Sequence, residues 1–89
     1  MKIYKYGLPR QRGDFKRAMS EIQYTMHVEV VNDNAYLWAC CDPTKELTYT
    51  IRVLFTGDDV PDMDNFLKIG TAVFDDGRYV LHYYREVSN

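Results

Sequence analysis

Four side chains of this 89-residue sequence carry atoms that often bind metals or act as nucleophiles, namely His27, Cys40, Cys41 and His82. Zinc sites usually contain a local pair of ligands, as in Cys-x-x-Cys or His-x-x-x-His, and the sequence has neither spacing. A reactive thiolate needs a partly exposed, electropositive setting. Because both cysteines lie in the most apolar run of the chain, we predict buried thiols, no metal and no cofactor.

A second candidate is a cluster of acidic side chains in a proline-containing segment, which comprises Asp58, Asp59, Asp62 and Asp64. The EF-hand pattern needs Gly at its sixth position and Glu at its twelfth, whereas counting from Asp59 these positions hold Asp64 and Gly70. Carboxylates that act as an acid–base pair need separate environments, which an exposed run does not provide. The sequence predicts a solvated acidic loop, with binding of a basic partner as the alternative.

The basic residues are concentrated near the start of the chain. Residues 1–17 hold six basic residues against one acid, a net charge of +5, and the remaining residues carry −7, for a total of −2. The candidate binding residues of this segment are Arg10, Arg12, Lys16 and Arg17, and Tyr83 and Tyr84 are further candidates in the last predicted strand. Basic and aromatic side chains together can bind phosphate and stack on bases. The acidic remainder of the chain disfavours nucleic acid, so an acidic protein or a phosphate-bearing ligand fits better.

The sequence contains no Gly-rich phosphate loop, no Gly-x-Ser-x-Gly elbow and no Walker motif. With no catalytic constellation, we predict that the protein is not an enzyme. Its composition of 46% hydrophobic and 27% charged residues is that of a globular protein, and its length fits one domain over residues 1–89. The apolar runs are far shorter than the roughly 20 residues of a membrane helix, and residues 1–5 lack the core of a signal peptide. We expect a cytoplasmic protein.

The stretch Ala35–Cys41 predicts the central strand, because it is a short apolar run between the turn signals Asn32–Asn34 and Asp42–Pro43. Trp38 is therefore expected to be mostly buried. Consecutive strand residues point to opposite faces, so we also predict no disulfide between Cys40 and Cys41. The hairpin turn before this strand should bring it against the preceding one.

The remaining pattern is mostly that of β-structure. Alternating apolar residues predict strands over 2–6, 24–30, 47–55, 67–73 and 78–87, the first of them at a sheet edge. Phe15, Ala18, Met19 and Ile22 instead follow steps of 3, 4 and 7 residues, as on a helix face. The fold class predicted is mainly β, a small antiparallel β-sandwich or open barrel of six to seven strands with at most one short helix.

Several motifs resemble an uncharacterised family of small proteins from tailed phages and prophages. They are Ile3-Tyr4-Lys5-Tyr6, His27-Val28-x-Val30, Leu37-Trp38-Ala39-x-x-Asp42-Pro43, Thr56-Gly57, Ile69-Gly70-Thr71 and Val80-x-His82. The resemblance spans nearly the whole chain and implies a phage-type context without an assigned activity. It also implies a strand-like segment over residues 15–20. Helix and strand therefore both remain open for residues 15–22, and the strand interpretation gives the seventh strand.

Together these features predict a small non-enzymatic binding protein of phage type, an inhibitor or modulator of a host or defence protein in the manner of anti-CRISPR proteins. The alternative is a protein that binds a small ligand or sequesters a nucleotide. We further predict a homodimer, because a lone sheet has edges to protect and both faces of the last strand are largely apolar.

Overall fold

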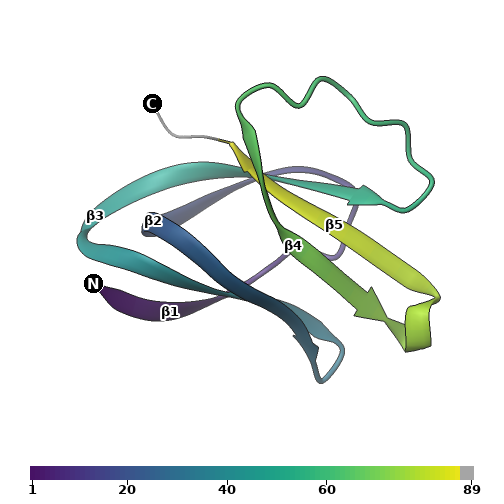
Figure 1. Cartoon of the computed structure of the whole chain (residues 1–89), viewed down its shortest axis with the longest axis horizontal. Helices are drawn as coiled ribbons and strands as arrows, with labels where there is room; N and C mark the ends of the chain where they lie inside the picture. The colour runs from purple at the N-terminus through teal and green to yellow at the C-terminus, as the bar shows by residue number, and fades with distance from the viewer. Residues whose placement is uncertain (87–89) are drawn as a thin grey trace.

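The computed structural model describes residues 1–86, which form one open antiparallel sheet of five strands (Figure 1). The elements are β1 (Lys2–Gly7), β2 (Gly13–Val31), β3 (Asn34–Phe55), β4 (Phe66–Phe74), the short 3-10 turn η1 (Asp75–Gly77) and β5 (Tyr79–Glu86). This part of the chain contains no α-helix. The prediction of a mainly β, antiparallel fold is confirmed, and the prediction of six to seven strands is wrong.

Strand β3 is the element with which most of the sheet pairs. Strand β2 follows one edge of β3 along almost its whole length. The other edge is shared, because β1 pairs with residues Tyr36–Cys41 and β5 pairs with residues Ile51–Phe55. Strand β4 then pairs with β5. The predicted inner position of Ala35–Cys41 is therefore confirmed, as is the prediction of an edge strand at the start of the chain.

The strand count is lower than expected partly because Pro43 does not end a strand. Ser20 and Glu21 of β2 pair with Glu46 and Asp42 of β3, so the three residues between those partners are looped out of the ladder. A looped-out proline removes no ladder hydrogen bond. The Asp42 carboxylate closes the bend by accepting hydrogen bonds from the backbone N–H and the hydroxyl of Thr44, at 2.9 and 2.6 Å. Strand β3 therefore turns back on itself and continues (Figure 1).

Residues 15–22, for which helix and strand were both open, form part of β2. The edge of β3 supplies hydrogen-bonding partners along this segment, and Met19 and Ile22 are buried in the core. The helix-like spacing of the apolar residues is thus overridden by pairing with a distant strand. Because this segment joins the strand predicted over residues 24–30, the two make one element of 19 residues.

The hydrophobic core lies inside the bent sheet. Leu37, Ile51, Val53 and Tyr83 are fully buried there. The molecule measures only 17 Å along its shortest axis, which fits two layers of strands about 10 Å apart. Strand β4 lies against β2 without pairing to it, with Gly70 at the point of contact. The layers therefore come from folding one sheet over rather than from two separate sheets.

Two of the predicted hairpin turns are confirmed. Asn32 and Asp33 adopt φ angles of 50° and 65°, as a two-residue hairpin turn requires. The turn η1 lies at the predicted Asp75–Gly77. The last predicted strand is β5, whose described residues end at Glu86, and Val87 lies outside them.

We expect Tyr49→Phe to lower the free energy of unfolding by about 1–3 kcal/mol, because it leaves a buried backbone donor without its partner. The hydroxyl of buried Tyr49 accepts a hydrogen bond of 2.8 Å from the backbone N–H of Ile22. Urea denaturation followed by far-UV circular dichroism would measure the loss. Tyr84→Phe is the matched control, since Tyr84 lies on the outer face and should be nearly neutral. Equal stability of both variants would contradict the structural role of Tyr49.

Candidate functional site

The basic and acidic loops predicted to bind partners meet each other at one end of the molecule. The Arg12 guanidinium forms two hydrogen bonds to the Asp58 carboxylate, of 2.7 and 3.0 Å. Asp58 also accepts a 2.8 Å hydrogen bond from the backbone N–H of Phe55. Arg12 first, and the Phe55 N–H second, lower the pKa of Asp58. This pair therefore stabilises the loop at neutral pH and is lost as pH falls through the lowered pKa.

Arg52, on the outer face of the sheet, forms a second bidentate pair and also anchors the acidic loop. Arg52 donates to both carboxylate oxygens of Asp14, at 2.9 and 3.0 Å, and to the backbone carbonyl of Asp62 at 2.9 Å. Its guanidinium carbon lies 4.0 Å from the centre of the Phe66 ring. Hydrogen bonding to Arg52 lowers the pKa of Asp14. Much of the charge in the two loops is thus engaged within the chain.

Arg10 lies at a cavity at the end of the core. Its Nη1 donates to the backbone carbonyl of Asp33 at 2.8 Å and to the Asp33 carboxylate at 3.0 Å. Its guanidinium stacks 4.4 Å from the centre of the Phe74 ring. The cavity has a volume of about 160 Å³ and is lined by Arg10, Phe55, Phe74, Tyr79 and Leu81. Arg12 stacks on the neighbouring Phe55 ring at 4.5 Å, so two arginines flank this end of the core.

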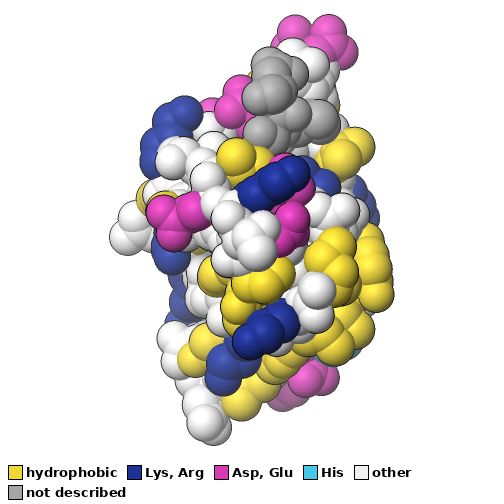
Figure 2. All heavy atoms as spheres, turned by 90° about the vertical axis from the view of Figure 1, so that its left-hand side faces the viewer, with side chains coloured by type: hydrophobic (Ala, Val, Ile, Leu, Met, Phe, Trp, Pro, Cys, Tyr) yellow, Lys and Arg dark blue, Asp and Glu magenta, His cyan; other side chains and the backbone are white. Residues whose placement is uncertain are grey.

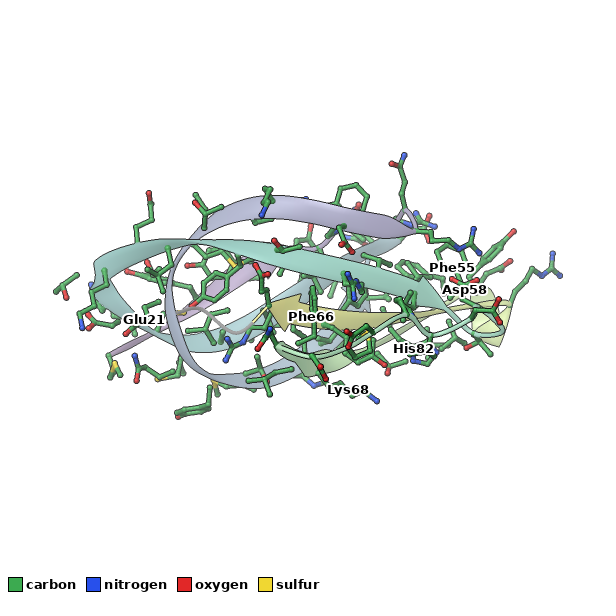
Figure 3. All side chains as sticks on the ribbon, turned by 90° about the horizontal axis from the view of Figure 1, so that it is seen from above. Glu21, Phe55, Asp58, Phe66, Lys68 and His82 are labelled. Carbon is green, nitrogen blue, oxygen red and sulfur yellow. The ribbon has the colours of Figure 1, made fainter. Side chains whose placement is uncertain are left out.

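The other predicted charged residues lie apart from this cavity. Lys16 donates to the Thr50 hydroxyl at 2.9 Å, and Arg17 to the Gly7 carbonyl at 3.4 Å. The remaining acidic residues of the predicted site, Asp59, Asp62 and Asp64, are exposed in the loop. Figure 3 shows Phe55 and Asp58 at one end of the molecule, with Glu21 at the opposite end.

The two predicted tyrosine contacts have different environments. Tyr83 is fully buried, and its hydroxyl donates a 2.7 Å hydrogen bond to the Pro9 carbonyl. Burial raises the pKa of Tyr83 to about 12. Its side chain holds the basic loop against the core and offers no surface to a partner. Tyr84 is half-buried on the outer face, between Arg52 and Lys68 in the sheet register.

The histidines and cysteines do not form a common site. The two ring nitrogens of His82 lie 2.8 Å from the Thr56 hydroxyl and 3.5 Å from the Thr71 hydroxyl. His27 is exposed on the other half of the sheet. Both cysteines are buried, and burial raises the pKa of the Cys41 thiol. Within residues 1–86, no three ligand-type side chains come together in a way that could hold a metal ion.

A surface not predicted from the sequence lies on the outer face of β1, β3 and the second half of β2. We define this outer aromatic face by six side chains that the sheet register places together, which are Ile3, Lys5, Tyr24, His27, Tyr36 and Trp38. The Trp38 ring lies 6.1 Å from that of Tyr36 and 6.0 Å from that of His27, and Lys5 lies 4.7 Å from the centre of the Tyr36 ring. Figure 2 shows hydrophobic side chains gathered on one side of the molecule, beside basic ones.

The prediction that Trp38 is mostly buried is confirmed, but its side chain lies on the outer face of the sheet and not in the core. Trp38 keeps some exposed surface, whereas its neighbours Leu37 and Ala39 are fully buried. Successive strand residues point to opposite faces, and only the inner face is covered by the second layer. The apolar run is therefore covered completely on its inner face and only partly on its outer face, where Tyr36 and Trp38 keep some exposed surface.

Two bulges in β2 explain why Tyr24 was missed. The register shifts between Ile22 and Tyr24 and again between Thr25 and His27, so an extra residue interrupts the alternation at each place. Tyr24 is 58% exposed, although the period-two pattern puts it on the same side as the core-facing Val28. Alternation alone gives no signal for such bulges.

The fold and these surfaces define a class, that of small single-sheet β proteins with an exposed aromatic face and an arginine-flanked cavity. Residues 1–86 contain no helix of the length and apolarity needed to span a membrane. The whole chain, residues 1–89, matches the model of a domain of unknown function, DUF7352, and the protein belongs to that family. No curated protein and no solved structure matches it.

Proposed function

We propose that the protein is a small non-enzymatic binding protein whose outer aromatic face docks on another protein. The observation that carries the proposal is the exposure of large apolar side chains at this face, since Ile3 is 60% and Tyr24 58% exposed. Both flank buried Cys40 across the sheet, so they lie on one continuous surface. Exposed apolar patches of this kind mark interaction sites in soluble proteins.

The chemistry of the face suits a protein partner. Tyrosine and tryptophan are enriched at the centres of protein interfaces, where their large rings bury apolar area and keep a polar atom for hydrogen bonding. Lys5 and the His27–Glu29 pair, in which Nε2 of His27 and Oε1 of Glu29 lie 3.7 Å apart, provide polar contacts around the rings. The rings are carried by paired strands, so the backbone loses little conformational freedom on binding. We therefore expect a partner surface that is apolar with acidic groups facing Lys5.

The likeness to small phage and prophage proteins supports a more specific role. In that context the partner is a host or defence protein, and binding inhibits or modulates it in the host cytoplasm, as anti-CRISPR proteins do. A partner at the basic loop would have to compete with the bonds from Arg10 to Asp33 and from Arg12 to Asp58. The outer aromatic face is the better surface because its side chains form fewer hydrogen bonds and ion pairs that a partner would have to replace.

The test is capture of a partner by matched double variants. We expect a protein retained from host lysate by the wild type to be lost with Ile3→Ser/Tyr24→Ser. The control Leu67→Ser/Val73→Ser removes apolar side chains of similar exposure, 48% and 52%, from β4 and should retain the same protein. Mass spectrometry identifies the retained protein, and melting curves confirm that both variants fold. Equal capture by both double variants would exclude the outer aromatic face.

A second copy of the chain is the alternative occupant of this face. The apolar side chains of β5 do not favour a homodimer, because Leu81 and Tyr83 are buried within one chain. If the homodimer forms, we propose that it uses the outer aromatic face. Light scattering would then report a dimer for the wild type and a monomer for Ile3→Ser/Tyr24→Ser.

The second candidate function is binding of a small ligand. The cavity beside Arg10 favours it, because aromatic walls and a guanidinium converge there. The sequence already suggested a ligand or nucleotide bound by the basic group, and Arg10 is the member of that group that lines the cavity.

A further inference from the structure

We infer that the cavity beside Arg10 binds a single aromatic ring that carries a carboxylate. The inference rests on the second candidate function, small-ligand binding, and names the ligand class. It concerns the end of the core near the β2–β3 turn and η1, a different surface from the outer aromatic face.

The size of the cavity limits the ligand to one ring. Its volume is about 160 Å³. Apolar cavities of about 150 Å³ hold a benzene molecule, whereas pockets for drug-sized ligands measure about 300–1,000 Å³. The cavity therefore cannot enclose a whole nucleotide, and a six-membered ring fits it.

The residues that line the cavity form an apolar floor and an opening that is partly aromatic and partly charged. Phe74 and Leu81 are almost completely buried and form the floor. Tyr79 is 49% exposed and Arg10 is exposed, so these two residues form the opening. A ring on this floor would contact aromatic and aliphatic carbon, and a substituent on the ring would point toward Arg10. This arrangement sets the orientation of the ligand.

Arg10 has donors left for an anion. Its hydrogen bonds within residues 1–86 all leave from Nη1, to Asp33, which leaves Nε and Nη2 for a ligand. Nε and Nη2 are one edge of the guanidinium fork, whose two parallel N–H groups match a carboxylate. Stacking on Phe74 and bonding to Asp33 hold the guanidinium in place before a ligand arrives. The site therefore selects a carboxylate over a neutral or cationic substituent.

The experiment is a titration of ¹⁵N-labelled protein with three probes that share a ring and differ in charge, namely phenylacetate, 2-phenylethanol and phenethylamine. We expect phenylacetate at millimolar concentrations, as befits a single-ring fragment, to shift the amide signals of Phe55, Phe74, Tyr79 and Leu81. The alcohol should bind more weakly and the amine most weakly. Arg10→Met should weaken phenylacetate binding about tenfold or more, the usual loss for a hydrogen bond to a charged group, and leave the alcohol unchanged.

The control is Arg17→Met, which removes the same charge from an exposed arginine that does not line the cavity and should bind phenylacetate normally. If the alcohol binds as well as the acid, or Arg10→Met binds the acid normally, the ligand class is overturned while a ligand site remains. If none of the three probes shifts the cavity signals, small-ligand binding at this site is overturned as well. Neither result affects the proposed protein docking, which is tested by capture.

Discussion

Leu37→Ala is expected to lower the free energy of unfolding by about 2–5 kcal/mol, because it leaves a cavity in the centre of the core. Leu37 is fully buried and lies between Tyr6 of β1 and Val28 of β2 in the sheet register. Total stability of small domains is about 5–15 kcal/mol, so we expect this one change to remove a large part of it. Urea denaturation followed by far-UV circular dichroism would measure the loss.

The matched comparison is Trp38→Ala, the next residue along the same strand. Trp38 has the larger side chain, but it lies partly exposed on the outer aromatic face. We expect its truncation to cost less than Leu37→Ala, since less apolar area returns to water. A larger cost for Trp38→Ala would mean that the outer face is covered in solution, and repeating the measurement at several protein concentrations would reveal a covering second copy.

Gly70→Ala is the second substitution with a large expected effect. A Cβ atom at Gly70 would lie 2.6 Å from Cγ2 and 3.0 Å from Cβ of Val28, well inside normal contact distance. Strand β4 lies against β2 at this point without pairing to it, so the two layers must separate to admit a methyl group. Overpacking of this kind costs about 1–3 kcal/mol. Gly7→Ala is the control, because no atom lies within 4 Å of its added Cβ.

A double-mutant cycle tests whether the contact with Val28 is the cause. Val28→Ala removes the Cγ2 atom that clashes, so Gly70→Ala should cost less in a Val28→Ala background than in the wild type. The rescue should be partial, since Cβ of Val28 remains 3.0 Å away. Equal costs in the two backgrounds would show that Gly70 is needed for another reason.

Much of the fold could be predicted from the sequence where side-chain alternation and turn chemistry agree. Tyr49, Ile51 and Val53 alternate with polar residues in the sequence, and all three are buried in the core. Prediction failed where one strand is interrupted by looped-out residues. At Pro43 the chain bends without leaving the sheet, and near Met26 a bulge reverses the alternation. Both the bend and the bulge depend on pairing with the partner strand, and the local sequence pattern carries no information about that strand.

The candidate sites could be predicted less well. Opposite charges on the two loops were visible in the sequence, but the pairing of Arg12 with Asp58 joins residues 46 positions apart. Arg10 was a predicted binding residue, and its cavity is completed by Phe74 and Tyr79, which no sequence motif linked to it. Tyr83 shows the opposite case, since an expected contact residue proved to be part of the core.

The division of one edge of β3 between β1 and β5 has a consequence for the order in which the chain folds. Strands β2 and β3 are joined by a two-residue turn, so their pairing closes the shortest loop and requires the least loss of chain entropy. Strands β1 and β5 come from opposite ends of the chain, and each joins the rest of the sheet through β3, although β5 also forms a hairpin with β4. We expect the β2–β3 hairpin to be the folding nucleus, with the two terminal segments adding to it independently.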